Sequence, residues 1–488
     1  MSVPPPPPGQ PKSLFIILSG SRGDFQPWLA VSVQLVKAGF QVAMASNPEH
    51  EPLAKTAPVP IVFFSNGCSF KDYFVSEAAQ AAYVKDSVPA YIAALEAWRM
   101  TTAGPEAVEI LKGIDAYKPD AIICCGPMHE ETARWIPRLK RIPTLQTILM
   151  PVHFSAEAPP MSFLPNLPCG LNKTIYAKAF ADGRQKWYTF YGKAVEEYSG
   201  KPMSEWASTD GDVLYACGYG TPEQIANADP VLCLAFPEFA KKPTDPEAMV
   251  YTGYPFMTEH GKDSGAVWGE AGEKLEAFLA AGAPPVYVGY GSMKTGEPTE
   301  ITTRVVKALK MAEARGVILG GWGGLSLEAL TDPDLKAYAE KNCIFTEGAD
   351  HMALFPKCAV LVHHGGHGTT QTSIRSGTPA IVTPMHLDQK DHGKMLQDNG
   401  LGMVLKNFLQ NTPEELGTAI AKVIADDTMK AKCKEAAATV AKTDGAQAAA
   451  DYIKKWYMEK VVTGEQMKKA DADWEAMKST KKGGCTIL

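Results

Sequence analysis

The hydrophobic residues of this chain fall into short runs that alternate with stretches of helical spacing. Residues 14–18 (LFIIL) form an apolar run of the length expected for a buried parallel strand, and a polar loop follows at 19–24. In residues 25–37 the apolar positions recur at helical spacing, Pro27 suits a first turn, and Gly39 suits a helix stop. Residues 41–46 then have the pattern of a second strand. Together these segments predict the first unit of a doubly wound α/β domain.

The same alternation continues along the chain. Strands are predicted at 121–125 and 144–149, with a helix at 129–140 between them, and the segment 76–100 is helical and rich in apolar residues. Such an apolar helical segment either lines a binding cleft or packs in the core, and both interpretations stay open. In the second half, strands are predicted at 285–293, 316–319, 343–345, 359–362 and 380–384. Helices follow at 413–457, with a break near 443–445.

The length favours two domains. A chain of 488 residues exceeds one compact core of ordinary size, so two domains of roughly 200 residues each are expected. The predicted parts are a disordered Pro-rich tail at 1–12, a first domain at 13–252, a linker at 253–284, a second domain with terminal helices at 285–460, and a lysine-rich tail at 461–488.

Composition argues against several classes of protein. Hydrophobic residues make up 45%, charged residues 21%, and the net charge is −6, so no basic surface for nucleic acid is expected. No segment resembles a secretory signal, and no apolar run approaches the ~18 residues that a membrane-spanning helix needs. The ten cysteines lack metal-site spacing and are expected to be free thiols in the cytoplasm.

A glycine-rich turn between a strand and a helix is the strongest candidate site. Residues 359–370 give a strand, a loop with three glycines, and a helix expected to begin near Thr369. Glycines let the backbone approach a ligand, and a helix N-terminus attracts anions such as a diphosphate. Turns of this kind also occur for tight packing alone, and that alternative stays open. The predicted anion-binding residues are His363, His364, Gly365, Gly366, Gly368, Thr369 and Thr370.

A second polar pair follows the next predicted strand. Asp388 and Gln389 come soon after the strand at 380–384. The carboxyl ends of parallel strands meet at one edge of a sheet, so this pair is expected beside the glycine-rich turn. A carboxylate and an amide can bind vicinal hydroxyls of a sugar. Asp388 could equally cap the following helix.

Four ordered motifs carry a family resemblance. They are GSRGDFQP at 20–27, YVGYGSM at 287–293, LFP at 354–356 and VHHGGHGTT at 362–370, and the last is followed by GTP at 377–379 and by Asp388-Gln389. From about residue 14 to residue 457 the chain resembles nucleotide-sugar glycosyltransferases of the GT-B fold. The closest subgroup is the sterol 3-β-glucosyltransferases with their bacterial antibiotic-glycosylating relatives.

The resemblance implies a fold and a reaction. Two facing Rossmann-like domains would enclose a cleft, the first binding the acceptor and the second binding the donor. The implied reaction is inverting transfer of a hexose, with UDP-glucose as the expected donor, to a hydroxyl of a sterol or similar lipid. The UDP-sugar is then a co-substrate, and no cofactor or metal is required.

The resemblance also implies residue roles. Asp24 would be the general base, although it could simply cap the helix at Phe25. His363, Gly365, Gly368 and Thr369 would contact the diphosphate, Ser292 would meet it from the other side, and Asp388 with Gln389 would hold the sugar. Gly348 occupies the place where many plant members stack a tryptophan on the base, and His351 lies near that place.

Three departures from the subgroup leave the sugar open. His367 replaces a usual alanine, residues 385–387 replace small and aromatic residues, and Lys390-Asp391-His392 replaces a proline and aromatics. For the acceptor, a soluble polyketide or phenolic is an alternative to a lipid. A catalytically inactive, prenylated scaffold that binds sugar nucleotides is a further alternative.

The last four residues, CTIL, fit a prenylation signal. Cys485 would receive the lipid, and the terminal leucine favours geranylgeranyl. Lys478, Lys481 and Lys482 would add the basic charge that one lipid chain needs for durable anchoring. A prenyltransferase and a membrane surface are therefore expected partners, with peripheral membrane association of a cytoplasmic enzyme.

Overall fold

A computed structural model describes most of the chain. The described residues are 12–85, 87–125, 132–149, 167–168, 171–207, 229–240, 247–258, 272–291, 297–385 and 388–482. The predicted Pro-rich tail lies outside them except for Lys12, which begins the first strand.

The N-terminal domain is built on a parallel sheet. Within the described residues it has seven strands in the order β3-β2-β1-β4-β5-β6-β7. Their bounds are β1 Lys12–Ile17, β2 Phe40–Ser46, β3 Val62–Ser65, β4 Ala121–Cys125, β5 Thr144–Ile148, β6 Val231–Cys233 and β7 Met249–Tyr251. The helices of this part are α1 Arg22–Lys37, α2 Glu51–Ala54, α3 Phe70–Val75, α4 Glu77–Lys85, α5 Val88–Tyr117, α6 Thr132–Lys140, α7 Asn172–Ser199 and α10 Pro237–Ala240.

The C-terminal domain repeats the plan on a second parallel sheet. Its described strands run in the order β10-β9-β8-β11-β12-β13. Their bounds are β8 Val286–Gly289, β9 Gly316–Leu319, β10 Cys343–Thr346, β11 Val360–His363, β12 Ala380–Val382 and β13 Gly402–Val404. The helices are α11 Gly272–Ala280, α12 Pro298–Met311, α13 Pro333–Asn342, α14 His351–Leu354, α15 His367–Ser376, α16 Asp388–Asp398, α17 Pro413–Ala425 and α18 Asp427–Val440.

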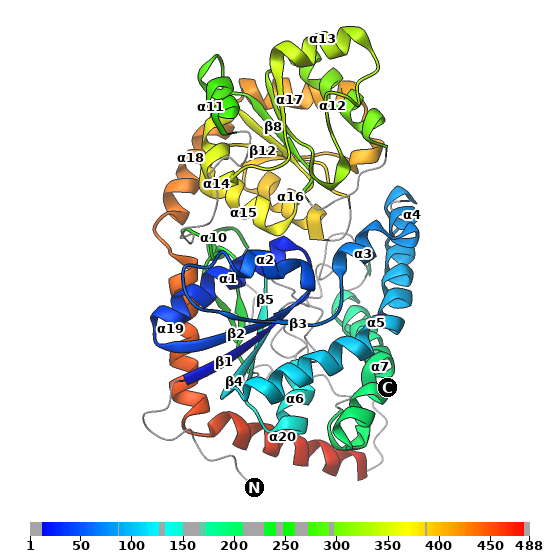
Figure 1. The fold of residues 1–488 in the computed structure, drawn as a ribbon, viewed down its shortest axis with the longest axis vertical. Coiled ribbons are helices and arrows are strands. Elements are labelled where there is room, and N and C mark those ends of the chain that lie inside the picture. Colours follow the sequence, from blue (N-terminus) through cyan, green and yellow to red (C-terminus); the bar gives the residue numbers. More distant parts are fainter. Residues whose placement is uncertain are drawn as a thin grey trace.

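These elements confirm the predicted α/β fold with two doubly wound domains. The central strands are apolar because helices cover both faces of each sheet, and every residue of β4 is buried. All strand pairs between described residues are parallel, as connection through helices requires. Figure 1 shows the two domains stacked along the long axis, with α15 and α16 of one facing α1 and α2 of the other.

The end of the chain returns to the N-terminal domain. After α18, helix α19 (Gly445–Trp456) packs on α1, and α20 (Glu465–Lys482) crosses the base of this domain in Figure 1. Ile453 and Trp456 of α19 belong to the same buried cluster as Trp28 and Leu29 of α1. The N-terminal domain is therefore completed by residues from the far end of the sequence.

The chain passes between the domains twice, and the two crossings touch. Gly253 and Tyr254 lie on the first crossing, and Gly445 on the second. A Cβ atom added to Gly445 would come within 2.4 Å of the Tyr254 carbonyl oxygen, so the two backbones are in direct contact there. No helix in the described part of the chain is long and apolar enough to cross a bilayer.

The packing of α19 yields a test of this arrangement. Ile453→Ala should destabilise the protein by about 2–5 kcal/mol, because Ile453 is fully buried against α1 and its removal leaves a cavity. Urea unfolding followed by tryptophan fluorescence measures the change. Lys454→Ala, on the exposed face of the same helix, should stay within about 0.5 kcal/mol of the unmodified protein. Equal effects of the two substitutions would contradict the packing of α19 on α1.

Candidate active site

The predicted site residues gather where the strand order of each sheet reverses. In the first sheet β1 lies between β2 and β4, and the loop after β1 leads to Asp24. In the second sheet β8 and β11 are neighbours, and the glycine-rich turn follows β11. Ligands of open α/β sheets bind at these reversals, outside the carboxyl ends of the strands. Helices α1 and α15, which begin at the two reversals, contact each other.

Asp24 lies in the first turn of α1 rather than before it. Ser21 is the N-cap, and its hydroxyl accepts a hydrogen bond from the Gly23 N–H at 3.2 Å. The Asp24 Oδ2 accepts in return from the Ser21 N–H at 2.7 Å and from the Ser21 hydroxyl at 3.0 Å. This reciprocal pair is a capping box, so the prediction that Asp24 itself caps a helix at Phe25 is wrong in detail. The box fixes the carboxylate in one orientation.

Burial makes Asp24 a weak acid for an aspartate. Loss of solvent raises its pKa to about 6, against the lowering effect of the two bonds from Ser21. The carboxylate of Asp388, across the domain interface, adds a smaller upward contribution. A carboxyl group with a pKa near neutrality is ionised at pH 7 and still accepts a proton readily.

The backbone before Asp24 is shaped around its carboxylate. Gly20 has φ +146°, and a Cβ atom there would lie 2.4 Å from the Asp24 Oδ2. Only glycine allows the chain to pass so close. The Gly20 N–H donates to the Asn47 Oδ1 at 2.8 Å, which ties this loop to the end of β2.

A buried polar network holds the start of the same loop. The Ser19 hydroxyl donates to Glu106 Oε1 at 2.6 Å, and the Asn66 amide donates to that oxygen at 2.9 Å. Arg99 pairs with the other oxygen of Glu106, and both charged side chains are almost fully buried. Sequence reasoning missed this network. Its one signal was an arginine and a glutamate seven residues apart in an apolar helical segment.

The glycine-rich turn has the geometry expected of an anion site. Gly365 has φ +89°, and a Cβ atom there would lie 2.6 Å from the Gln389 carbonyl oxygen, so the position requires glycine. Helix α15 begins at His367, two residues before the predicted start, and its N-cap Gly366 provides no side-chain cap. The first amides of α15 therefore point out of the helix without an intrahelical acceptor.

Several polar atoms around this turn are buried without a hydrogen-bond partner in the described part of the chain. They are His363 Nε2, His364 Nδ1 and Thr370 Oγ1. The Nδ1 of His363 accepts from the Gly365 N–H at 3.0 Å, so its Nε2 carries the proton. Burial lowers the pKa of His364 to about 4 and that of His363 further, so both rings are neutral donors. Unpaired buried donors are expected where a ligand completes the site.

The other predicted donor residues are distributed around the turn. His351 begins α14; its Nε2 lies 2.9 Å from the Tyr287 hydroxyl, its ring stacks on Phe355, and burial lowers its pKa to about 3. Gln389 is buried, and its Oε1 accepts from the Met385 N–H at 2.8 Å.

Asp388, the first residue of α16, is 39% exposed, and partial burial raises its pKa. Gly368 and Thr369 lie half-buried in the first turn of α15. Ser292 falls outside the described residues, but a Cβ atom added to the preceding Gly291 would lie 3.0 Å from the His364 ring.

Tyr254 and His392 also belong to the neighbourhood of the turn. Tyr254, on the first domain crossing, meets the His367 ring edge-on at 5.2 Å, and a Cβ atom on Gly368 would come within 2.9 Å of its hydroxyl. His392 of α16 lies 3.2 Å from His367 through ring nitrogens. The sequence marked His367 and His392 only as departures from the subgroup.

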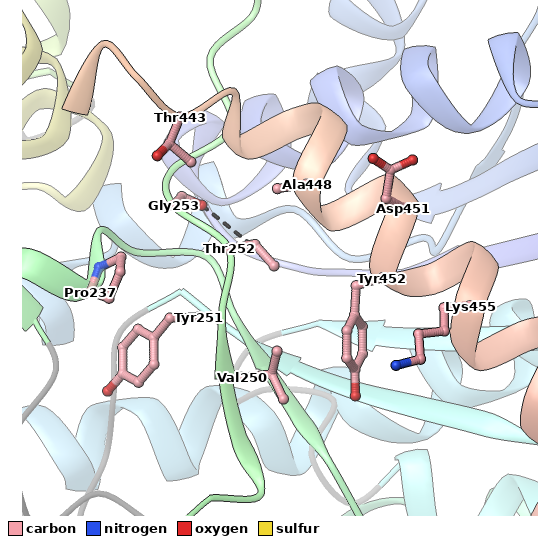
Figure 2. Close-up of a pocket in the computed structure, with 10 residues that line it drawn as sticks. All are labelled: Pro237, Val250, Tyr251, Thr252, Gly253, Thr443, Ala448, Asp451, Tyr452 and Lys455. Carbon is pink, nitrogen blue, oxygen red and sulfur yellow. Dashed lines mark hydrogen bonds between the residues drawn. The ribbon is translucent and has the colours of Figure 1, made fainter. Parts of the chain in front are cut away.

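A separate cavity of about 510 Å³ lies beside the domain crossings. Figure 2 shows its walls, which come from the end of β7, the first crossing and α19, with Tyr251 and Tyr452 on either side of Val250. None of the predicted donor or catalytic residues lines it.

Comparison with known proteins agrees with the geometry. Residues 346–453 match the family described as Erythromycin biosynthesis protein CIII-like, C-terminal domain. The sterol 3-beta-glucosyltransferase UGT80B1 of Arabidopsis thaliana is 25% identical over 445 residues, which cover 89% of this chain and 66% of the plant protein. Glycosyltransferase GtfE of Amycolatopsis orientalis is 27% identical over 449 residues, which cover 89% of this chain and 95% of the bacterial protein.

A solved structure shares the fold. The crystal structure of the glycotransferase of kitacinnamycin is 17% identical and superposes with a TM-score of 0.62, covering 91% of this chain and 99% of the other. At this identity the likeness supports the arrangement of two parallel-sheet domains and nothing finer.

The raised pKa of Asp24 can be tested through stability. A carboxyl group whose pKa is higher in the folded than in the unfolded state favours folding at low pH, and the effect is lost as the pH rises through the folded value of about 6. Asp24→Asn cannot ionise and does not lose stability in this way. The difference in free energy of unfolding, variant minus unmodified protein, should therefore increase between pH 4 and 7.

Ser21→Ala removes the hydroxyl bond that lowers this pKa. It should move the same window to higher pH and cost about 1 kcal/mol through loss of the cap. Urea titrations across this pH range measure both effects. A difference between Asp24→Asn and the unmodified protein that does not change with pH would contradict the buried carboxyl.

Proposed function

We propose that the chain is a glycosyltransferase of the GT-B fold and that it transfers a hexose, with UDP-glucose as donor, to a hydroxyl of a sterol or similar lipid. The relatives just described include a sterol glucosyltransferase and a bacterial enzyme of the same general activity. Donor, acceptor and stereochemistry are parts of this proposal.

One observation carries the proposal: Asp24, whose carboxyl group has a pKa raised to about 6, lies in the first turn of α1, and α1 contacts helix α15 of the other domain. Asp24 of α1 is suited to take a proton at neutral pH. The first turn of α15, with Gly365 and Gly366 before it, is suited to hold a diphosphate. Sugar transfer from a nucleotide donor needs these two groups on opposite sides of the sugar.

In the proposed reaction, Asp24 accepts the proton of the acceptor hydroxyl. The acceptor oxygen forms a bond to the anomeric carbon, and the bond from that carbon to the diphosphate oxygen breaks, so the electron pair leaves with UDP. Attack from the side opposite the leaving group inverts the anomeric configuration. The amides of α15 and the neutral ring of His364 donate hydrogen bonds to the departing diphosphate.

The two neighbouring histidines have different roles in this proposal. His364 is half-buried and its Nδ1 has no partner among the described residues, so it can meet the ligand directly. His363 is fully buried, and its Nδ1 accepts a hydrogen bond from the Gly365 N–H, so it fixes the shape of the turn. Its protonated Nε2 is a donor on the buried side of the turn. Asp388 would accept sugar hydroxyls, while Gln389 steadies the loop in front of it through Met385.

The identity of the acceptor is the most specific part of the proposal. Helices α3 to α5 carry a cluster of aromatic rings, including Phe70, Tyr73, Tyr91 and Trp98, which pack on one another. Tyr91 lies close enough to Asp388 for the charge of that carboxylate to contribute to the raised pKa of the Tyr91 hydroxyl. An apolar aromatic wall beside the sugar site favours a lipid over a polar acceptor, whereas a polyketide or phenolic is the alternative.

Asp24→Asn tests the role of the base. Transfer of glucose from UDP-glucose to detergent-dispersed sterol should fall by at least about 100-fold, because an amide cannot take the proton. Binding of UDP-glucose, measured by calorimetry, should be retained. A panel that includes phenolic and polyketide acceptors distinguishes the alternative substrates in the same assay.

Glu415→Gln is the matched control, since Glu415 forms the capping box of α17 with Thr412 and lies in the other domain. It removes the same charge from the same kind of helix start and should leave transfer unchanged. If no nucleotide sugar binds to the protein or raises its melting temperature, the proposed function fails. Full transfer by Asp24→Asn would exclude Asp24 as the base.

Prenylation of Cys485 stays a prediction, because the residue lies outside the described part of the chain. A lipid at this position would bring the enzyme to acceptors dissolved in a membrane. Intact mass of the protein expressed in a eukaryotic host should show the added geranylgeranyl group and the loss of residues 486–488. An unmodified mass would remove this part of the proposal and leave the transfer reaction untouched.

A further inference from the structure

Within the described residues, which exclude 292–296 after β8, the glycine-rich turn at 363–370 carries no lysine or arginine. The rings of His363 and His364 are held neutral by burial. The amides of α15 supply only the partial charge of a helix end. Arg22, whose charge acts on His351, is an exposed residue of α1 in the other domain. A buried cation beneath the turn would therefore change how strongly a diphosphate binds.

His367 and His392 form a continuous chain of ring nitrogens beneath the turn. His367 Nε2 lies 3.3 Å from the Leu234 carbonyl oxygen, and His367 Nδ1 lies 3.2 Å from His392 Nε2. At the other end, His392 Nδ1 lies 2.7 Å from the Gly365 carbonyl oxygen. Both rings are buried, with 8% and 4% exposed. The chain runs from the N-terminal domain to the glycine-rich turn.

The three hydrogen bonds of this chain need three ring protons, one more than two neutral imidazole rings carry. Carbonyl oxygens only accept, so both end contacts are hydrogen bonds only when His367 carries a proton on Nε2 and His392 carries one on Nδ1. If both rings were neutral, the two remaining nitrogens would face each other at 3.2 Å with a lone pair on each side. All three hydrogen bonds form only when a third proton sits between the rings, which makes the pair a monocation.

The surroundings favour His392 as the charged ring. Burial and the neighbouring His392 lower the pKa of His367 to about 3, so His367 stays neutral. Asp388 Oδ2 lies 3.9 Å from His392 Nδ1 and supplies an opposite charge. The titratable groups that act on the pair are His363, His364 and Asp388, and Tyr254 packs on His367. Asp24 of α1, which contacts α15, acts on Asp388 and Tyr254.

We propose that His392 is a buried imidazolium that donates to His367 and to the Gly365 carbonyl, and that its charge strengthens binding of the donor diphosphate from beneath the turn. This inference rests on the proposed function for its ligand, a nucleoside diphosphate sugar. His392 and His367 are positioning residues, since they act through the turn. Because the same chain ends on Leu234, it also ties the turn to the N-terminal domain.

Histidine-selective ¹⁵N NMR of the full chain tests the protonation directly. The chain has ten histidines, so their ring signals can be resolved by substitution. At pH 7 we expect a ring with both nitrogens protonated that disappears in His392→Gln and weakens in His367→Met, where the acceptor for Nε2–H is lost. Absence of any doubly protonated ring assignable to His392 would overturn the proposal, whether or not a nucleotide binds.

Calorimetry with UDP-glucose tests the effect on the ligand. This donor has no titrating group near neutrality, so any linked proton comes from the protein. Asp24 ionises in the same pH range, so the pH series is measured in Asp24→Asn, which is expected to retain binding. In that background the affinity should fall as the pH rises, and at pH 7 it should be roughly tenfold weaker when His392→Gln is added. Lys394→Ala removes an exposed charge from the same helix and should bind like the unmodified protein. Thermal unfolding checks that each variant is folded.

The possible failures are distinguishable. If the unmodified protein binds no nucleotide sugar, the proposed function fails, and the NMR result still decides the state of the pair. If it binds UDP-glucose with an affinity that is independent of pH and unchanged in His392→Gln, the function stands and the proposed charge is wrong. Uridine, which lacks the diphosphate, should show neither pH dependence nor sensitivity to His392→Gln.

Discussion

The arrangement of this protein depends on one constraint of parallel sheets: all strands of a sheet end at the same edge. Each domain collects its polar loops at that edge, and the two edges meet where α1 contacts α15. Asp24 and the glycine-rich turn come from segments more than 300 residues apart, yet each follows the central strand pair of its own sheet. The chemistry of the site is therefore a property of the domain interface and belongs to neither domain alone.

At Asp24 two opposing effects are balanced within one turn of helix. Burial raises the pKa of the carboxyl group, whereas the bonds from Ser21 lower it. A stronger set of donors would leave an ordinary, weakly basic aspartate, and deeper burial without Ser21 would leave a protonated acid at pH 7. The capping box thus stabilises the helix and sets the pKa of the carboxyl group with the same atoms, and Gly20 gives it the space that any side chain would fill.

The sequence predicted the long apolar strands of the two sheets well and several of the short strands poorly. The strands at 121–125 and 316–319 have the predicted bounds, because their apolar runs are buried on both faces. The three-residue strands β6, β7 and β13 were not predicted, whereas β12, which is equally short, was predicted as part of the longer run 380–384. Helix α15 begins two residues early because Gly366, rather than a polar side chain, ends the turn.

For the site, motif order located the loops but could not assign partners. His351 was expected near the nucleotide base. In the structure its ring lies within hydrogen-bond distance of the Tyr287 hydroxyl and stacks on Phe355. The Glu106–Arg99 network lies inside the core, where sequence spacing carries no signal of its link to Ser19.

The departures from the subgroup are informative in combination. Taken one at a time, His367 and His392 looked like unrelated replacements, but α15 and α16 bring their rings into contact. An alanine in place of His367 would have no polar ring atoms to satisfy. His367 and His392 lie between the carbonyl oxygens of Leu234 and Gly365, so their ring nitrogens need hydrogen-bond partners. Two substitutions that each bury a polar ring are costly alone and compatible together, because each satisfies the other. Such a pair also couples three features that the fold otherwise keeps apart: the strand end at Leu234, the turn at Gly365 and the carboxylate of Asp388. A change in the separation of the domains would break the bond to Leu234 first, and the proton count of the pair would then change with it.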